Sequence, residues 1–332
     1  MGRLNLLVDN TRWTAQEFGD VDCVERQVPA CAGLETAFQR RMPIPVEIEP
    51  NLGAALRHLL SHPGSMVRPR VVFRLGLAYG IEQQAAIDLA IALEYFHTAS
   101  LVFDDLPCMD NAQMRRGATC VHVQHGDSGA ILAALALINR AYALVWRAAA
   151  RSPHVLQQMA LKYLEERLGV GGLLNGQSLD LHFDTLPHNA QSTVLVARGK
   201  TVSLIELTLC LPAILGGASR RELQLLERIS NCWGMSYQIV DDLKDLLQSS
   251  SESGKTAARD ASLNRPNLAL AGGVPYAIER LVRLLRAGDR NVETLLSKRS
   301  SLAFLREFRA GMDGDLNRVL AGAGISTVEG EA

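Results

Sequence analysis

Apolar residues recur along most of the chain at intervals of three and four, the spacing that lines one face of an α-helix. Alternating runs of β-branched residues, which are typical of strands, are nearly absent. The single Asn-Gly pair, Asn175-Gly176, lacks flanking runs of that kind and does not indicate a hairpin. The pattern therefore predicts an all-α protein.

Prolines, glycines and short polar residues mark the expected ends of these helices. Pro50 opens one helix and Pro63-Gly64 closes it, since proline has no N–H to donate. Gly80 is suited to cap the end of a helix, Asp127-Ser128 to cap the start of one, and Pro212 to kink one. The predicted helices are one within Ala15–Arg41, then Asn51–Ser61, Arg68–Tyr79, Gln83–Phe103, Gly129–Ala150, His154–Leu168, Leu173–Phe183, Arg198–Leu215, Arg221–Leu247, Pro275–Ala287 and Leu302–Leu320.

Other stretches break the periodic pattern. The segment up to about Pro45 is predicted to be peripheral and Phe183–Ser192 to be a loop. Leu246–Arg265, rich in serine, glycine and charge, predicts a mobile lid, and residues 322–332 a disordered tail. None of these stretches resembles a linker between two cores. A chain of 332 residues that is 48% hydrophobic is therefore expected to form a single domain over residues 1–332.

Composition excludes several classes of function. The formal net charge of −1 offers no basic surface for nucleic acid. Six cysteines without a C-x-x-C pair are expected to be reduced thiols in a cytoplasmic protein. The first residues are not expected to form a signal peptide. The longest apolar run, Ala130–Leu144, is interrupted by Asn139 and Arg140 and falls short of the roughly 18–20 residues of a membrane span, so no stable membrane insertion is expected.

The first candidate site follows one apolar run. The run ends in Asp104 and Asp105, Pro107 breaks the helix, and Asp110 is then expected to fold back toward the pair. Three carboxylates this close repel one another unless a cation lies between them. Oxygen ligands without nearby histidine and cysteine favour Mg2+, which commonly shares its coordination shell with substrate phosphates.

A second acidic cluster makes a site more probable than a solvated acidic turn. Arg115 and Arg116 follow the first cluster, and the guanidinium group binds phosphate oxygens in pairs. Further on come Asp241, Asp242 and Asp245, of which the first and last lie one helical turn apart. Like charges at that spacing destabilise a helix unless a cation binds them. Two such helices facing each other across a bundle would form a metal site from inward carboxylates.

These motifs resemble those of the trans-prenyltransferases, or polyprenyl diphosphate synthases, of the bacterial geranylgeranyl diphosphate synthase type. The resemblance runs from about Gly64 to Gly273. The residues that match family motifs are Asp104, Asp105 and Asp110 in the first aspartate-rich motif, Arg115 and Arg116, His122 and Gly126, Gly176, Gln177 and Asp180 in GQxxD, Lys200 and Thr201, Gln238 with Asp241, Asp242 and Asp245 in the second motif, and Lys255 and Asp260 beyond it.

The resemblance implies a single-domain isoprenoid synthase bundle of roughly ten or more helices around a central cavity. It implies a Mg2+-dependent prenyltransferase, expected to be a homodimer, that holds an allylic diphosphate through about three metal ions on the two aspartate clusters. Arg115, Lys200 and Lys255 would contact the phosphates. Lys200, Thr201 and Gln238 would be catalytic, the last two facing the allyl cation.

The implied acceptor site departs from the family pattern. The resemblance assigns isopentenyl diphosphate to Arg68, His97 and Arg116, but Ser65 stands where a lysine is usual. The loss of one charge-assisted phosphate contact costs about 1.5–3 kcal/mol. Arg70 would compensate if its helix presents it inward.

Four alternatives stay open: an elongating synthase that tolerates Ser65, a terpene cyclase on the same fold that needs no acceptor, a non-catalytic partner subunit, and an inert bundle. The intact aspartate clusters argue against the last two. In Arg265-Pro266-Asn267, which replaces a lysine-serine/threonine stretch of the family, Arg265 keeps the charge.

The expected product is geranylgeranyl diphosphate. The resemblance places Ala99, five residues before the first aspartate, along the wall where the product chain extends. Farnesyl-forming relatives usually carry an aromatic residue at or beside that position, so a farnesyl diphosphate synthase is the alternative. Each further CH2 in an apolar channel contributes about 0.8 kcal/mol, so an open wall favours one more addition. Residues of Gly129–Ala150 are candidates for what stops growth.

Overall fold

Helices make up nearly all of the protein that the computed structural model describes, residues 33–247 and 265–311. They are α2 (Leu34–Arg40), α3 (Pro50–Leu60), α4 (Val67–Ala78), α5 (Gln83–Asp104), α6 (Val121–Ala149), α7 (His154–Leu168), α8 (Leu173–Leu181), α9 (Ala190–Ala197), α10 (Ser203–Leu215), α11 (Arg220–Leu247), α14 (Leu268–Gly272), α15 (Val274–Leu296) and residues 305–311. Short 3-10 turns lie at Phe183–Thr185 and Ser300–Leu302 and a π-helical turn at Arg198–Val202. The all-α prediction is confirmed.

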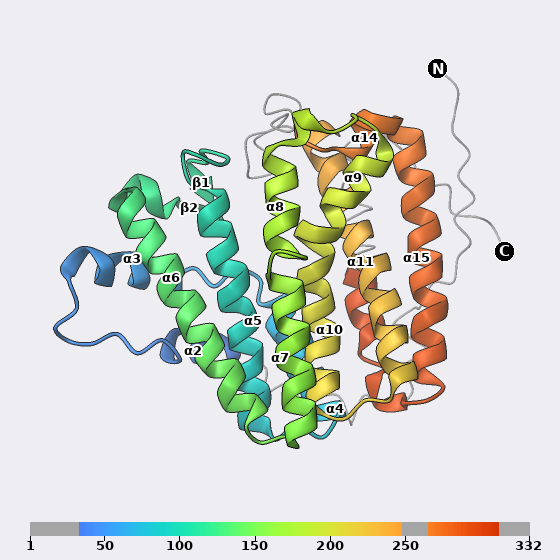
Figure 1. Ribbon diagram of the computed structural model, residues 1–332, viewed down its shortest axis with the longest axis horizontal. Helices are drawn as coiled ribbons and strands as arrows, with labels where there is room; N and C mark the ends of the chain where they lie inside the picture. Colours follow the sequence, from blue (N-terminus) through green and yellow to red (C-terminus); the bar gives the residue numbers. More distant parts are fainter. Residues whose placement is uncertain (1–32, 248–264, 312–332) are drawn as a thin grey trace.

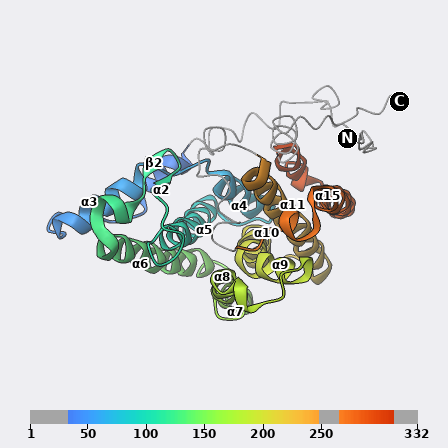
Figure 2. The same cartoon turned by 90° about the horizontal axis from the view of Figure 1, so that it is seen from above.

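The helix α5 lies inside the bundle. It has α6 and α3 on one side, and α10, α11 and α15 follow on the other (Figures 1 and 2). Its residues are buried on all faces over most of its length, which explains why its sequence is apolar rather than amphipathic. Both α5 and α11 run toward the same end of the bundle, so their acidic C-terminal residues lie at that end (Figure 1).

Several predicted helix boundaries agree with the structure. The helix α7 has the predicted limits, and α11 begins one residue early. Gly80 adopts a φ of 81°, a left-handed conformation that glycine tolerates, and the Ile81 N–H donates to the Gly76 carbonyl at 2.8 Å. This arrangement ends α4 as expected.

The predicted starts of α6 and of the helix that contains α10 were wrong. The helix α6 starts at Val121 rather than Gly129, and Gly126 (φ 76°, ψ 163°) breaks it directly before the expected caps. The expected helix Arg198–Leu215 is also longer, because Asn189 accepts from two backbone N–H groups and starts α9 at Ala190. Between α9 and α10 the backbone forms the π turn, which periodicity did not indicate.

The hairpin of β1 (Met114–Arg115) and β2 (Ala118–Thr119) was not predicted either. Its turn residues Arg116 (φ 52°) and Gly117 (φ 76°) both have positive φ, as a two-residue hairpin loop requires. The predicted helices at the C-terminus differ as well, since α15 extends to Leu296 and the last described helix covers 305–311. Most of the expected lid, the tail and most of the first 45 residues lie outside the described part.

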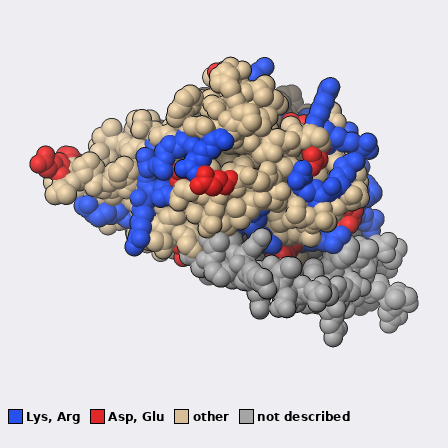
Figure 3. All heavy atoms as spheres, turned by 90° about the horizontal axis from the view of Figure 1, so that it is seen from below, with Lys and Arg blue, Asp and Glu red and all other residues tan. Residues whose placement is uncertain are grey.

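Two helices, α5 and α6, are long and apolar enough to cross a membrane by length and composition alone. The apolar window of α5 is 72% buried, which identifies it as the core helix of the bundle, whereas that of α6 is 44% buried. On the face seen from below, basic side chains lie beside acidic ones rather than forming a field of one sign (Figure 3). This mixture agrees with the net charge of −1.

Candidate active site

The first acidic cluster forms where α5 ends. The helix stops at Asp104, three residues before Pro107. The Asp110 N–H then donates to the Asp104 carbonyl at 2.9 Å, and the Ala112 N–H donates to the Asp105 carbonyl at 3.1 Å. The chain therefore turns back on itself after the helix, as predicted.

The two adjacent aspartates have different surroundings. Asp105 is buried, and its two oxygens accept from the Arg115 Nε at 2.9 and 3.2 Å. Burial raises the pKa of Asp104 to about 6; Lys200 opposes this rise, whereas Asp110 and Asp180 add to it. Asp104 therefore lies in a group of carboxylates that repel one another, while Asp105 is already paired.

Lys200 joins the first cluster to α8. Its Nζ donates to Asp180 Oδ2 at 2.8 Å and lies 3.8 Å from Asp104 Oδ2. Burial and the two carboxylates act on the lysine in opposite directions, and its pKa is raised. Lys200 is therefore a charged ammonium group among acids. The lysine belongs to the π turn, and the two acids belong to α5 and α8.

Two glycines allow this approach. Lys200 belongs to the π turn, whose neighbour Gly199 touches Gly176 of α8. A Cβ at Gly176 would lie 2.3 Å from the Lys200 backbone nitrogen, and one at Gly199 would lie 2.6 Å from the Gly176 Cα. No larger residue fits at either position. π turns occur frequently at functional sites, and here the turn presents both Lys200 and Thr201.

The second acidic cluster belongs to a chain of hydrogen bonds. Thr201 Oγ1 donates to Gln238 Oε1 at 2.6 Å, and Gln238 Nε2 donates to Asp242 Oδ1 at 2.9 Å. The other oxygen of Asp242 accepts from the Leu268 N–H at 2.7 Å, and Asp242 is 1% exposed. Asp241 and Asp245 are partly exposed on α11. Asp242 therefore orients Gln238, whereas the other two acids remain partly accessible.

Arg265 lies between α8 and the first cluster. Its Nη2 donates to Asp110 Oδ1 at 2.8 Å and to the Met109 carbonyl at 3.3 Å. Its Nη1 donates to the Asp180 carbonyl at 3.0 Å. The expectation that Arg265 keeps a positive charge here agrees with these contacts.

A second group of charges lies around His97, about two helical turns before the acidic end of α5. Arg68 Nη1 lies 3.0 Å from His97 Nε2, and Arg116 Nη2 donates to Glu94 Oε1 at 3.2 Å. Burial, followed by Arg68, places the pKa of His97 well below its usual value, so the imidazole is neutral. Arg68, His97 and Arg116, which the resemblance grouped, do lie together.

Glu94 is a member of this group that the sequence analysis missed. It is 2% exposed, and burial raises its pKa against the influence of Arg68 and Arg116. A carboxylate inside an apolar helix, three residues before His97, was the available signal, because positions three apart share one helical face.

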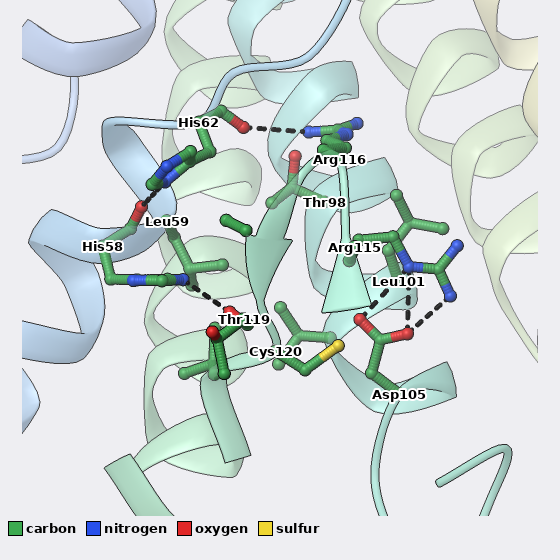
Figure 4. A pocket seen from close by; sticks show the side chains of 13 residues that line it. His58, Leu59, His62, Thr98, Leu101, Asp105, Arg115, Arg116, Thr119 and Cys120 are labelled. Carbon is green, nitrogen blue, oxygen red and sulfur yellow. Dashed lines mark hydrogen bonds and ion pairs between the residues drawn. The ribbon is translucent and has the colours of Figure 1, made fainter. Parts of the chain in front are cut away.

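Arg116 has an unusual backbone conformation, and its side chain packs against a glycine. Its φ of 52° is unfavourable for a residue with a side chain. Its guanidinium passes over Gly64 (φ 74°), where a Cβ would lie 2.7 Å from the Arg116 Cζ, and its Nη1 donates to the His62 carbonyl at 3.3 Å. Figure 4 shows this bond, together with the Asp105–Arg115 pair, around a pocket between α3, α5 and the hairpin.

The condition for compensation by Arg70, that its helix presents it inward, is not met. Its side chain is 45% exposed and lies 3.8 Å from Glu35 Oε1. Positions 68 and 70 are about 200° apart around a helix, so Arg70 points away from the side on which Arg68 lies. Ser65 is exposed. The acceptor group thus has no additional arginine from this helix.

The remaining predicted residues are placed as follows. Ala99 is fully buried on α5, and His122 is buried at the start of α6. Neither ring nitrogen of His122 has a hydrogen-bond partner among the described residues. Lys255 and Asp260 lie outside the described residues.

Comparison with known proteins places this site in a family. The family model named polyprenyl synthetase matches residues 49–293. Geranylgeranyl pyrophosphate synthase 4 of Arabidopsis thaliana is 35% identical over 250 residues, 74% of this chain and 67% of that protein. Geranylgeranyl diphosphate synthase of Pantoea ananas is 34% identical over 221 residues, 66% of this chain and 72% of that protein. The chain belongs to the polyprenyl synthetase family, and it is a prenyltransferase.

The fold agrees with solved structures. A geranyltransferase from Helicobacter pylori, complexed with magnesium and isoprenyl diphosphate, superposes with a TM-score of 0.77 at 23% identity. The superposition covers 91% of this chain and 99% of that one. At this identity the likeness establishes the isoprenoid synthase fold alone.

Proposed function

We propose that the protein condenses an allylic diphosphate with isopentenyl diphosphate and makes mainly geranylgeranyl diphosphate. One observation carries this proposal: two groups of cations lie along α5, Lys200 and Arg115 at its acidic end, and Arg68 and Arg116 beside His97, about two turns earlier. An enzyme that joins two diphosphates needs two such groups. A cyclase that ionises one diphosphate needs only the first.

The acidic end of the site suits Mg2+. Asp104 is crowded by Asp110 and Asp180, which raise its pKa, and Asp241 and Asp245 add carboxylate oxygens one turn apart on α11. Oxygen donors of this kind fit Mg2+. We expect Asp104, Asp110, Asp241 and Asp245 to hold about three ions, with Asp105 and Asp242 orienting Arg115 and Gln238. When bound, Mg2+ would stabilise the negative charge of the departing diphosphate.

The protein side chains act on the donor as follows. Lys200 and Arg115 bind oxygens of the allylic diphosphate, since each carries a charge held at the end of α5. Asp105 fixes the plane of Arg115 through the Nε, so the guanidinium presents its outer edge. Thr201 and Gln238, joined at 2.6 Å, offer oxygen lone pairs to the allyl cation that forms as the C1–O bond breaks.

The acceptor diphosphate is bound by Arg68 and Arg116, and neutral His97 fixes Arg68 at 3.0 Å. The double bond of isopentenyl diphosphate attacks C1 of the allyl cation and forms the new carbon–carbon bond. The resulting cation loses a proton from its C2, and the departed diphosphate takes it. Ser65 adds no charge, so this site binds its ligand with two arginines.

We further propose that Tyr95 and Phe38 end the product channel. Ala99 offers a small side chain on α5, and Tyr95 lies one turn deeper on the same face. Tyr95 is fully buried, its OH donates to the Phe38 carbonyl at 2.5 Å, and the two rings meet edge to face at 5.1 Å. These aromatic residues are candidates for the stop in addition to those of α6.

The test is incubation of purified protein with Mg2+, isopentenyl diphosphate and each allylic diphosphate in turn. We expect consumption of isopentenyl diphosphate and a product of twenty carbons, with none formed in EDTA. Release of diphosphate without consumption of isopentenyl diphosphate would support the cyclase alternative and overturn condensation. A fifteen-carbon end product would support a farnesyl diphosphate synthase.

We also propose a homodimer formed through α6. Only 44% of its apolar window is buried, and large exposed apolar side chains line one face: Ile131, Leu132, Leu135, Tyr142 and Trp146. Light scattering after size exclusion should give twice the chain mass, and Leu135→Glu should give the monomer. Leu174→Glu, at an exposed position of α8, is the control. A monomeric native protein would contradict the dimer; one relative is described as the large subunit of a heterodimeric synthase, which makes a second chain the alternative partner.

A further inference from the structure

Arg265 is buried among carboxylates that we expect to bind metal. Its side chain is 10% exposed and lies 2.8 Å from Asp110 Oδ1 and 3.9 Å from Asp180 Oδ2. A guanidinium group loses hydration when it is buried, so its position needs strong partners. The partners here are acids of two elements, the turn after α5 and the helix α8.

Lys200 and Arg265 have different nearest acids. Lys200 Nζ lies 2.8 Å from Asp180 Oδ2 and 3.8 Å from Asp104 Oδ2, whereas Arg265 Nη2 lies 2.8 Å from Asp110 Oδ1. The carboxylates also repel one another, since Asp110 and Asp180 add to the rise that burial causes in the pKa of Asp104. In the absence of metal, the protein thus supplies cations of its own to these carboxylates.

The position of Arg265 is set by its neighbours in the chain. Asn267 is 2% exposed; its Nδ2 donates to the Asp242 carbonyl at 3.0 Å and its Oδ1 caps α14. The Leu268 N–H donates to Asp242 Oδ2. One short segment therefore connects both aspartate clusters, and Arg265 is anchored there rather than loosely placed on the surface.

An arginine makes this bridge in a way that a lysine would not. Arg265 donates to one carboxylate and two backbone carbonyls, those of Met109 and Asp180. The rigid fork of a guanidinium spans several acceptors, whereas an ammonium group is a point charge. Its Nε is nevertheless buried without an acceptor among the described residues, so one donor of the group is unsatisfied.

We propose that Arg265 is a resident counter-ion of the metal site: it holds Asp110 against α8 in the metal-free protein, and a divalent cation binds Asp110 by displacing it. This inference rests on the proposed function, because it takes Asp110 as a metal ligand. A diphosphate that arrives with the metal offers the displaced guanidinium new oxygens, including one for its Nε. Metal and diphosphate therefore help each other to bind, and Arg265 couples them.

The test measures Mn2+ binding to the ligand-free protein by electron paramagnetic resonance, which needs no turnover. In Arg265→Gln we expect Mn2+ to bind about tenfold more tightly, which corresponds to about 1.4 kcal/mol. The melting temperature without metal should fall, and its rise on saturation with Mn2+ should exceed that of the native protein. Inorganic pyrophosphate should tighten Mn2+ binding less in the variant than in the native protein.

Arg309→Gln is the matched control. Arg309 also bonds an aspartate, Asp289, at 2.8 Å and is 13% exposed, but it lies away from the site. Its loss should lower the melting temperature and leave Mn2+ affinity unchanged. Arg265→Lys, which keeps the charge, should lie between the native protein and Arg265→Gln and serves if the latter does not fold.

Unchanged or weaker Mn2+ binding in both Arg265 variants would overturn the inference, because no competitor would then have been removed. This failure differs from failure of the proposed function. A native protein that binds Mn2+ as described but consumes no isopentenyl diphosphate would contradict condensation and leave the role of Arg265 in place.

Discussion

Two charged groups along α5, the acidic end and the group around His97, balance their charges in opposite ways. Among the described residues at the acidic end, carboxylates outnumber side-chain cations, and the pKa of Asp104 is raised to about 6. In the group around His97, Arg68 and Arg116 share the carboxylate of Glu94, and His97 is neutral. The acidic end is therefore suited to added cations. The group around His97 is suited to an added anion.

This difference explains how one site can take two diphosphates in fixed roles. A diphosphate accompanied by Mg2+ is favoured at the acidic end, because bare anions are repelled by the carboxylates there. A diphosphate without metal is favoured beside Arg68 and Arg116. The charge of each group therefore selects its ligand. The helix α5 carries residues of both groups: Asp104 belongs to the acidic end, and Glu94 and His97 belong to the other group.

The largest effect should come from the acidic end. Asp104→Ala removes a carboxylate that we expect to bind metal, and turnover should fall roughly a thousandfold, because stabilisation of the departing diphosphate is lost. Steady-state assays over a range of Mg2+ concentrations measure this. Asp184→Ala, at an exposed position after α8, should have no effect. Near-native turnover in Asp104→Ala would mean that the acidic end is not the metal site.

The next effect should be confined to the group around His97. Arg68→Gln removes one charged phosphate contact, so the KM for isopentenyl diphosphate should rise about tenfold to a hundredfold while that for the allylic substrate stays within about twofold. Arg70→Gln is the control, because it lies only two positions further but points away. Equal changes in both KM values would show that the acidic end and the group around His97 are not independent.

A smaller effect should follow from restoring the usual lysine. Ser65→Lys adds a cation at an exposed position, where water screens its charge, so the KM for isopentenyl diphosphate should fall about threefold. Val67→Lys adds the same charge two residues further along, also at an exposed position, and should change it less. No difference between the two lysines would mean that position 65 does not face the acceptor.

The sequence predicted the helices and acidic clusters of this site better than the contacts between its distant segments. Apolar periodicity placed α5, α7 and α11 to within one residue at most of their ends, because each is long and buried on a continuous face. The acidic clusters followed from spacing along those helices. Such patterns are local, and they are readable for that reason.

Contacts between distant segments had no local signal. Arg265 meets Asp110 across 155 positions, and Arg116 meets Glu94 across 22. The π turn depends on Gly199 touching Gly176, which becomes visible only after α8 has packed against it. Arg70 illustrates the converse, because its sequence position suggested a phosphate contact and the helix turns it outward.

The last prediction concerns the helix that both groups share and changes the product rather than the rate. Ala99→Tyr should shift the main product from geranylgeranyl to farnesyl diphosphate, because a ring would occupy the path that we propose for the growing chain toward Tyr95. Ala99 is fully buried, so overpacking should also cost about 1–3 kcal/mol of stability. Product analysis of the extracted lipids, with thermal unfolding in parallel, separates these effects.

Ala99→Ser, which barely changes the volume, should leave the product at twenty carbons and is the control for substitution at this position. Tyr95→Ala provides the opposite change: it should remove the stop formed with Phe38 and allow products longer than twenty carbons. If Ala99→Tyr folds and still makes geranylgeranyl diphosphate, the chain does not grow along this face of α5. In that case α5 would carry both charged groups but would not line the product channel, and the product length would be set elsewhere in the bundle.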